Sequence, residues 1–337
     1  MEMITSIDSS KAVRSTKRIQ VLDVLRGIAI FGMIISHFDA YGINDSDFLS
    51  GIVSQGVGYL IDDRFYTMFA ILFGAGFAIQ FIRAKDRGEK FILRFLRRMI
   101  TLACFGFIIN VAFGYAILYD YALCGLLLLL VRKWSTKGLI ITLFICVMLN
   151  PLYKIAFNST YSAFYGVEQV RKYYNQRNDD ARVLQAEQLK RNSIIKNTPN
   201  YFTAIKVRVK QFQWYPTTIN KIINLLSNTF MLFLIGFIAM RLNVFEEPGK
   251  RRRLIIGCMI LGIVFCALTF GALPFFPITD HLKYPNVSFL LEVILYFLSQ
   301  GFGLVRDNWL AFTYAGAVLL LISYNPFKWL NRFKFFA

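Results

Sequence analysis

The sequence predicts an all-α fold, a polytopic transmembrane helical bundle of about nine spans with one long extracytoplasmic loop. Three observations carry this prediction. Hydrophobic residues make up 56% of the 337-residue chain and charged residues 17%, whereas a soluble domain carries about a quarter charged residues. Several apolar runs reach the roughly 17–25 residues with which a helix crosses a bilayer. Lysine and arginine gather in alternate connections between these runs, as they do in cytoplasmic loops.

The expected spans form two groups around one long polar connection. Residues 1–18 are a polar tail that we place in the cytoplasm, and no small-residue cleavage site follows the first apolar run, so that run is expected to be retained. An N-terminal bundle of about five spans covers 19–156, the extracytoplasmic loop covers 157–221, and about four spans lie within 222–337. The expected spans are 19–38, 65–82, 99–113, 115–131, 139–156, 222–240, 254–270, 288–302 and 309–324.

The orientation follows from the charges of the connections. The N-terminal tail and the segments 83–98, 132–137 and 241–253 are rich in lysine and arginine, whereas the first connection carries several aspartates against the single Arg64. Short cytoplasmic loops hold the positive residues, so the N-terminus is expected in the cytoplasm. Long loops cross regardless of charge, so the basic residues of 157–221 are compatible with an outer location. The basic C-terminal end would then lie outside, so either one span is miscounted or the last segment is re-entrant.

Charge and cysteine content exclude two classes of function. The net charge is +18, but the positive residues follow the expected topology rather than one face, so no nucleic-acid partner is predicted. The five cysteines lie in apolar runs without a C-x-x-C pair. They are typical of small buried apolar residues, and neither a disulfide framework nor a metal site is predicted.

The first span carries three ionisable residues on one helical stripe, which makes it the most informative segment. Arg26 and His37 lie eleven residues apart, about three turns or roughly 16 Å along a helix, and Asp23 precedes Arg26 by three residues. Ionisable residues inside a span are costly and mark functional sites. The stripe therefore predicts a polar pathway into the bilayer. The alternative is a local Asp23–Arg26 ion pair near the cytoplasmic interface, with His37 reaching the outer one.

These residues and three further stretches resemble known membrane families. The spacing of Arg26 and His37 resembles the arginine-ten-residues-histidine spacing in the first span of the integral membrane acyltransferases of type 3. The rest resembles the YeiB-like bacterial membrane family, a relative within the wider transmembrane acyltransferase superfamily, over nearly the whole chain. The stretches are LDVLRGIA at 22–29, FGAGFA at 73–78 before the basic 94–98 cluster, and FLIGF at 233–237 leading to MRLNVF at 240–245.

The chain also departs from the YeiB-like pattern. His37 stands where these proteins usually have asparagine, and Asn110 and Tyr115 stand where relatives place a histidine and the glycine of a Gly-Asp pair, with Asp120 one turn later. The family's C-terminal segment would begin just after Ala337, so the chain is expected to be short or truncated relative to the family. A catalytically inactive family member is one reading of these departures.

The resemblance implies acyl transfer from cytosolic acyl-CoA to a glycan or lipid-linked acceptor at a bacterial cytoplasmic membrane. In this reading His37 is the general base, because its pKa suits proton transfer at neutral pH, and Arg26 completes the path toward it. Arg94, Arg97 and Arg98 would hold the phosphates of the donor, although positive residues at a membrane interface are also ordinary topology. No metal is implied.

Other polar residues have supporting roles in this interpretation. Glu292 in the eighth span is expected to line the same cavity or to pair with Arg306. Asp120 in the third–fourth hairpin is either a supporting residue of the site or, as an alternative, an interfacial polar residue. Ala70, Gly74 and Ala78 have the spacing of a helix-packing stripe and are interpreted as packing rather than a phosphate loop.

A rival hypothesis uses the same polar stripe without catalysis. The protein would then be a small-solute or proton-coupled transporter, or a membrane-assembly subunit. One cavity containing Arg26, His37 and the 94–98 cluster favours the enzyme, whereas two separated polar sites favour transport.

Overall fold

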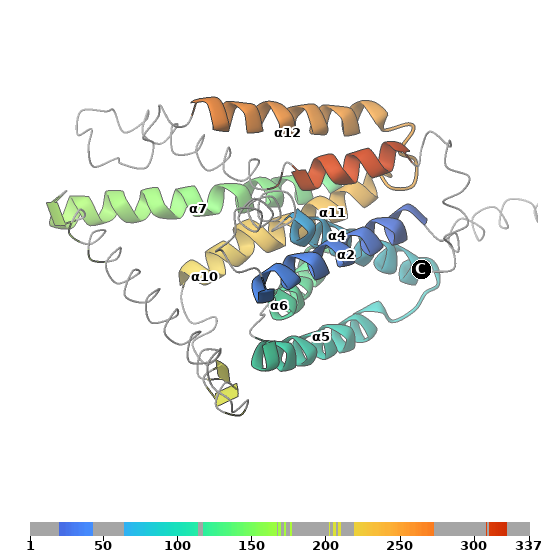
Figure 1. Ribbon diagram of the computed structural model, residues 1–337, viewed down its shortest axis with the longest axis horizontal. Helices are drawn as coiled ribbons and strands as arrows, with labels where there is room; N and C mark the ends of the chain where they lie inside the picture. Colours follow the sequence, from blue (N-terminus) through green and yellow to red (C-terminus); the bar gives the residue numbers. More distant parts are fainter. Residues whose placement is uncertain are drawn as a thin grey trace, which may run out of the picture.

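The protein, seen in a computed structural model, is helical throughout its described part, and no strand occurs among those residues. The structure describes residues 20–42, 64–113, 117–166, 219–272 and 310–321, together with Asn308 and single residues between 168 and 209. Its elements are α2 (Gln20–Gly42), α4 (Arg64–Asp86), α5 (Phe91–Phe113), α6 (Ile117–Val131), α7 (Thr136–Tyr165), α10 (Ile219–Asn224), the π-helix η1 (Leu225–Phe230), α11 (Met231–Arg241), α12 (Arg252–Ala272) and a helix over Leu310–Leu321 (Figure 1).

The helices α4 and α11 form the centre of the bundle, where their backbones touch. A Cβ atom on Gly74 would lie 2.0 Å from the carbonyl oxygen of Phe233, and one on Gly236 would lie 1.8 Å from a carbonyl oxygen of α4. Only glycine permits so close an approach of two helices. Ala70 and Ala78 are also completely buried, so the packing role predicted for this stripe is confirmed.

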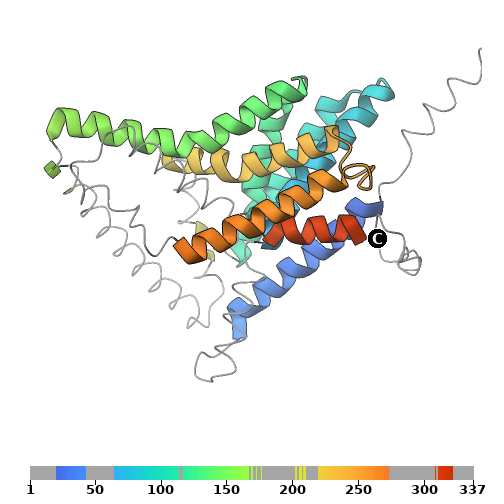
Figure 2. The same cartoon turned by 90° about the horizontal axis from the view of Figure 1, so that it is seen from above.

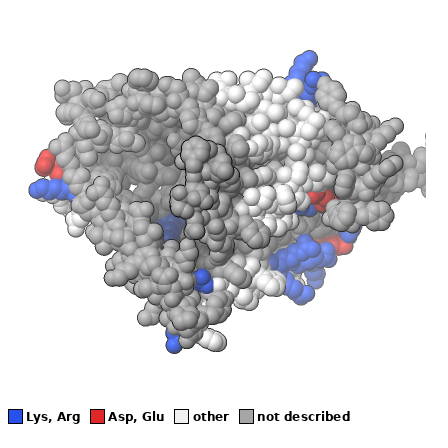
Figure 3. Space-filling view, viewed as in Figure 1, with Lys and Arg blue, Asp and Glu red and all other residues white. Residues whose placement is uncertain are grey.

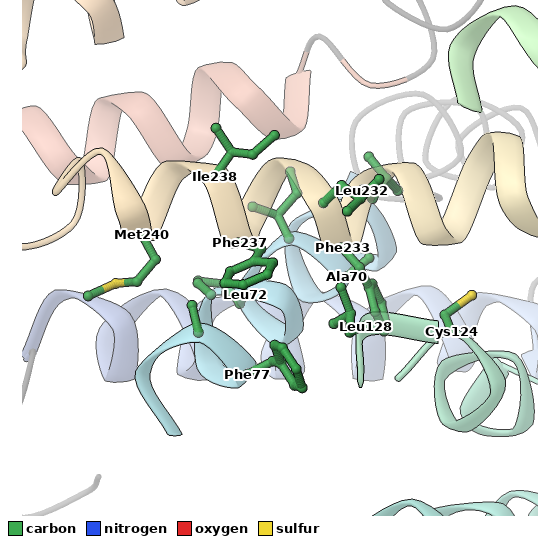
Figure 4. Packing of buried hydrophobic residues seen from close by; sticks show 14 of the residues in the cluster. Ala70, Leu72, Phe77, Cys124, Leu128, Leu232, Phe233, Phe237, Ile238 and Met240 are labelled. Carbon is green, nitrogen blue, oxygen red and sulfur yellow. The ribbon is translucent and has the colours of Figure 1, made fainter. Parts of the chain in front are cut away.

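Aromatic side chains fill the space around this crossing (Figure 4). The rings of Phe73 and Phe233 stack with centroids 4.6 Å apart, and Phe77 packs edge-on against Phe237 at 5.5 Å. Phe95 of α5 reaches Phe77 at 4.8 Å. Such pairs add to the free energy of burial, so α4, α11 and α5 share one apolar core.

Contacts along the helices fix their relative directions. Near the start of α4, the hydroxyl groups of Tyr66 and Thr229 are 2.8 Å apart, and near its end Phe77 meets Phe237. The helices α4 and α11 therefore run in the same direction.

The helix α2 runs the opposite way. A Cβ on Gly32 would overlap the ring of Phe65 at the start of α4, whereas Gly76 near the end of α4 lies beside Arg26. The start of α2 consequently lies at the same end of the bundle as the ends of α4 and α11, at the right of Figure 1.

The basic connections gather at this end, which we call the basic end. The turn between α4 and α5 is there because it follows α4, and the segment 241–252 is there because it follows α11. The Arg241 guanidinium donates a hydrogen bond to the carbonyl oxygen of Arg132 at 2.9 Å and another to that of Trp134, which adds the connection between α6 and α7. Three connections that were predicted to lie on one side of the membrane therefore share one end of the bundle. The cytoplasmic location of this basic end stays a prediction.

Two helix ends at the basic end have the same hydrogen-bonded geometry. Gly88 after α4 and Asn243 after α11 have φ of 65° and 56°. After Asn243 the Val244 amide donates to the Ala239 carbonyl oxygen at 3.0 Å. This left-handed cap suits glycine and asparagine. The 240–245 stretch, which resembles a family motif, therefore contains the C-terminal cap of α11.

Large apolar side chains are exposed on the outer helices. Leu93 of α5 and Phe144 of α7 are both 63% exposed, and Ile260 of α12 is 55% exposed. In Figure 2, α7 runs beside α11, and α12 beside the 310–321 helix, at the periphery of the bundle. Exposed apolar side chains in this number are typical of lipid-facing helices.

The number of spans is only partly settled by the helices. In the described part, Arg64–Asp86 and Lys221–Arg241 are long and apolar enough to cross a membrane, the latter joining α10, η1 and α11. Ile117–Val131, Thr136–Asn150 and Leu310–Leu321 are apolar but shorter. The count of about nine spans therefore stays a prediction, and the span predicted at 288–302 lies outside the described residues.

Several helices are longer than the apolar runs that predicted them. The helix α5 begins at Phe91, before the predicted 99, and α7 continues to Tyr165, beyond the predicted 156. Hydrophobicity delimits what fits in a bilayer, whereas a helix continues as long as its backbone hydrogen bonds do. The basic cluster 94–98 consequently lies on a helix rather than in a loop.

Candidate functional site

The polar stripe of α2 begins with an ion pair at the basic end. Nη1 of Arg26 lies 3.3 Å from Oδ1 of Asp23, and the two side chains are 39% and 22% exposed. Leu22 and Leu25, on the adjacent face of the helix, are buried and hold α2 against the core. Asp23 and Arg26 therefore lie, partly exposed, at the edge of the contact between α2 and the core.

Arg26 rests on a glycine of α4. A Cβ atom on Gly76 would lie 2.7 Å from Nη2 of Arg26, closer than real Cβ contacts. The 73–78 stretch that resembles a family motif thus has two roles. Gly74 admits α11 on one side, and Gly76 admits the Arg26 guanidinium on another.

A second arginine reaches the same face of α4 from α5. The guanidinium of Arg98 donates a hydrogen bond to Oε1 of Gln80. Gln80 follows Gly76 by four residues, so the two positions are neighbours on one stripe, about 6 Å apart along the axis. The Arg26 contact and the Arg98 hydrogen bond therefore fall at neighbouring positions on one stripe of α4, and we call these two arginines with Gly76 and Gln80 the arginine site.

The other two arginines of the cluster are placed differently. Arg94 pairs with one carboxylate oxygen of Glu89, and Nη1 of Arg87 lies 3.9 Å from the other. Arg97 is exposed. In Figure 3 lysine and arginine side chains form a group at the right of the view, with acidic side chains beside them. Arg94 and Arg97 therefore make none of the contacts that define the arginine site.

His37 and Asp120 belong to the opposite end. His37 lies on α2 eleven residues beyond Arg26, roughly 16 Å along the axis, and its side chain is outside the described residues. Asp120 is half-buried in the first turn of α6, which runs antiparallel to α5, because Gly106 meets the start of α6 and Gly125 meets Met99. Glu292 lies outside the described residues.

Sequence reasoning missed a hydroxyl cluster away from the basic end. The Tyr66 hydroxyl contacts that of Thr229, and the buried Tyr121 hydroxyl donates to the Tyr66 carbonyl oxygen at 3.0 Å. Thr229 belongs to η1, and π-helical turns occur often at functional sites. The available signal was a pair of hydroxyl residues, Ser227 and Thr229, inside an apolar run.

Sequence reasoning also missed Gly76 and Gln80 as members of the site. Gln80 is an uncharged polar residue within the apolar helix α4, four residues from Gly76. That spacing was the signal in the sequence, but nothing in the sequence identifies the arginines that meet it.

A known protein family matches the part of the chain that contains these residues. Residues 18–179 match the family described as heparan-alpha-glucosaminide N-acetyltransferase, catalytic. This stretch contains α2, α4, α5, α6 and α7, and therefore the arginine site, His37 and Asp120. The acyltransferase part of the predicted resemblance is supported, whereas the YeiB-like assignment and the arginine–histidine spacing stay predictions.

Two bacterial relatives are similar to part of the chain. The uncharacterized protein YxaH of Bacillus subtilis (strain 168) is 32% identical over 173 residues, which cover 46% of this chain and 42% of that protein. The uncharacterized 39.9 kDa protein in the amylase 3' region of Bacillus acidopullulyticus is 32% identical over 145 residues, which cover 41% and 42%. The chain thus spans about two fifths of the length of these relatives. No solved structure matches the chain.

The arrangement has a definite chemical capacity. Guanidinium groups form charge-assisted hydrogen bonds to phosphate, and two of them contact neighbouring positions of α4. No group of three or more histidine, cysteine or acidic residues able to hold a metal comes together in the described ranges. The arginine site is thus suited to an anionic, phosphate-bearing ligand that approaches from the basic end.

Proposed function

We propose that the protein is a membrane acyltransferase that takes an acyl group, with acetyl as the first candidate, from acyl-CoA. One observation carries the proposal. Arg26 and Arg98 contact neighbouring positions on one stripe of α4, within the stretch that matches an acetyltransferase catalytic family. Coenzyme A is cytosolic and anionic, so a donor site at the basic end fits a cytoplasmic N-terminus.

In this proposal the donor phosphates bind at the arginine site. Arg26 and Arg98 make the direct contacts, and Arg94 and Arg97, exposed on the same helix as Arg98, attract the donor by their charge. Asp23 holds one edge of the Arg26 guanidinium, which leaves the remaining N–H groups to the ligand. Such a preformed pair lowers the entropy cost of binding.

The transfer step takes place further along α2. The roughly 16 Å between Arg26 and His37 is of the order that an extended pantetheine arm spans, so phosphates at Arg26 bring the thioester toward His37. His37 removes the proton of a hydroxyl or amine acceptor, the acceptor atom bonds to the acyl carbonyl carbon, and the C–S bond breaks. The proton held by His37 then passes to the departing thiolate, which releases CoA as the thiol and restores the neutral base. Asp120 and Glu292 are supporting polar residues in this proposal.

The acceptor and the location complete the proposal. The acceptor is a glycan or lipid-linked molecule reached from the outer side, and the lipid bilayer of a bacterial cytoplasmic membrane surrounds the exposed apolar faces of α5, α7 and α12. The long connection 157–221 lies on the acceptor side. One residue of this connection, Arg208, donates a hydrogen bond to the carbonyl oxygen of Ala112 near the end of α5.

The deciding experiment measures donor binding. Purified full-length protein in detergent is heated with acetyl-CoA, with CoA and with pantetheine, because a ligand that binds the folded state raises its unfolding temperature. We expect acetyl-CoA and CoA to raise the temperature and pantetheine to have little effect. The double variant R26A/R98A is expected to lose the response, whereas Arg253→Ala, an exposed arginine of α12, retains it. A response that is equal in both variants would refute the donor site.

A transporter or membrane-assembly subunit is the second candidate. It is favoured by the separation between the arginine site and the hydroxyl cluster of Tyr66, Tyr121 and Thr229, which lies nearer the other end of the core. Reconstituted vesicles distinguish the two. Acetylated product from acetyl-CoA supports the enzyme, whereas binding of the anion without product and with net flux across the vesicle supports transport.

A further inference from the structure

We infer that Gly76 is a positioning residue for the donor, because it provides the surface on which the Arg26 guanidinium rests. The inference depends on the proposed donor site and names the feature of α4 that orients it. Nη2 of Arg26 lies 2.7 Å from the place where a Cβ of residue 76 would be, while Nη1 of the same group is 3.3 Å from Oδ1 of Asp23. The guanidinium is thus fixed between a carboxylate of α2 and the bare backbone of α4.

The three close-packed glycines at this part of the bundle differ in what a methyl group would displace. At Gly74 and Gly236 it would meet main-chain atoms of the neighbouring helix, which cannot move without separating α4 from α11. At Gly76 it would meet only Nη2 and, at 3.9 Å, Cζ of Arg26. The end of a long side chain moves at little cost, so a methyl group there shifts the guanidinium and leaves the backbone in place.

Helix propensity makes this shift separable from damage to the fold. Alanine is favoured over glycine inside a helix, so Gly76→Ala adds stability to α4 while it displaces Arg26. A variant that unfolds at an unchanged or higher temperature and binds the donor more weakly has lost orientation of the guanidinium. General destabilisation would instead lower both the unfolding temperature and the affinity for the donor.

The experiment is a double-variant cycle on the full-length protein in detergent, with acetyl-CoA as the probe. Dissociation constants are measured for the wild type, Gly76→Ala, Arg26→Ala and the double variant G76A/R26A. The matched control is Gly27→Ala, which lies next to Arg26 in α2 and has open space around its Cβ position. We expect Gly76→Ala to weaken binding about tenfold, Gly27→Ala to leave it unchanged, and Gly76→Ala to have no further effect once Arg26 is alanine.

Two outcomes overturn the inference while leaving the proposed donor site intact. One is wild-type binding by Gly76→Ala together with weakened binding by Arg26→Ala. The other is a loss of equal size from Gly76→Ala with and without Arg26, which would show an effect independent of the guanidinium.

Unfolding temperatures of the same four proteins test the contact even if the donor proposal fails. Relief of the overlap predicts that Gly76→Ala raises the unfolding temperature more in the Arg26→Ala background than in the wild type. Equal shifts in both backgrounds would refute the contact. Wild-type acetyl-CoA binding by Arg26→Ala would refute the donor site alone.

Discussion

The carboxamide oxygen of Gln80 accepts a hydrogen bond from the guanidinium of Arg98, and this bond joins α4 to α5 four residues beyond the glycine on which Arg26 rests. The relationship makes Gln80 the counterpart of Asp23. Each provides one oxygen acceptor that orients one arginine of the site, and neither fully occupies the guanidinium, which has five N–H donors.

The first prediction concerns this carboxamide. Gln80→Leu removes the acceptor at similar volume, so the Arg98 guanidinium loses its orientation and we expect acetyl-CoA binding to weaken several-fold. The bond is at an exposed position, so the unfolding temperature should change little. Calorimetric titration beside Gln80→Glu, which keeps an acceptor, measures the effect. Leucine and glutamate variants that bind alike would show that the bond does not orient Arg98.

The second prediction concerns the crossing of α4 and α11. Gly236→Ala places a methyl group against main-chain atoms of α4, and overpacking of this kind typically costs about 1–3 kcal/mol. We expect a clearly lower unfolding temperature. Gly257→Ala in α12, where the Cβ position is open, is the control and should be neutral or slightly stabilising. If both variants unfold at the wild-type temperature, the helices do not meet as closely as described.

The third prediction separates binding from transfer. His37→Ala should abolish acetyl transfer in vesicles while acetyl-CoA still raises the unfolding temperature, because the base lies roughly 16 Å from the arginine that binds the donor. Arg26→Ala should reduce both. His37→Asn is the most informative variant, since asparagine is the residue usual in YeiB-like proteins. Full transfer activity in that variant would exclude His37 as the base.

The fourth prediction concerns topology. Because the basic connections share one end of the bundle and short positive loops stay in the cytoplasm, a cysteine introduced at Lys85 should react with a membrane-impermeant reagent only after cell lysis. A cysteine at Gln176, in the long connection, should react in intact cells. The background protein has Cys104 and Cys258, both exposed, replaced by serine. Labelling of position 176 only after lysis would reverse the topology.

The sequence was a good guide to features that depend on one helix at a time. Apolar runs predicted the positions of α2, α4 and α11. The Asp23–Arg26 ion pair that the structure shows was the alternative to the polar pathway predicted from the same stripe. The stripe around Gly74 predicted close helix packing without naming its partner. Local periodicity is sufficient for such features.

The arginine site was less accessible because it depends on which sides of α4 receive α2 and α5. Arg94 and Arg98 are one turn apart and equivalent in the sequence, yet one pairs with Glu89 in the preceding turn and the other with Gln80 on a different helix. Periodicity places both on one face of α5 but does not say where that face lies. The roles of Gly76 and Gln80 therefore required the tertiary arrangement.

The backbone contact between α4 and α11 has a consequence for motion. The glycine contacts bring the two backbones together and stacked aromatic rings fill the space around them, so we expect α4 and α11 to move as one rigid unit. The two arginines of the site belong to different outer helices, α2 and α5, and each contacts α4. If acyl-CoA binds at the arginine site as proposed, we expect its entry and departure to move α2 and α5 relative to the α4–α11 pair. The turnover rate of the proposed reaction would then depend on how fast α2 and α5 separate from α4.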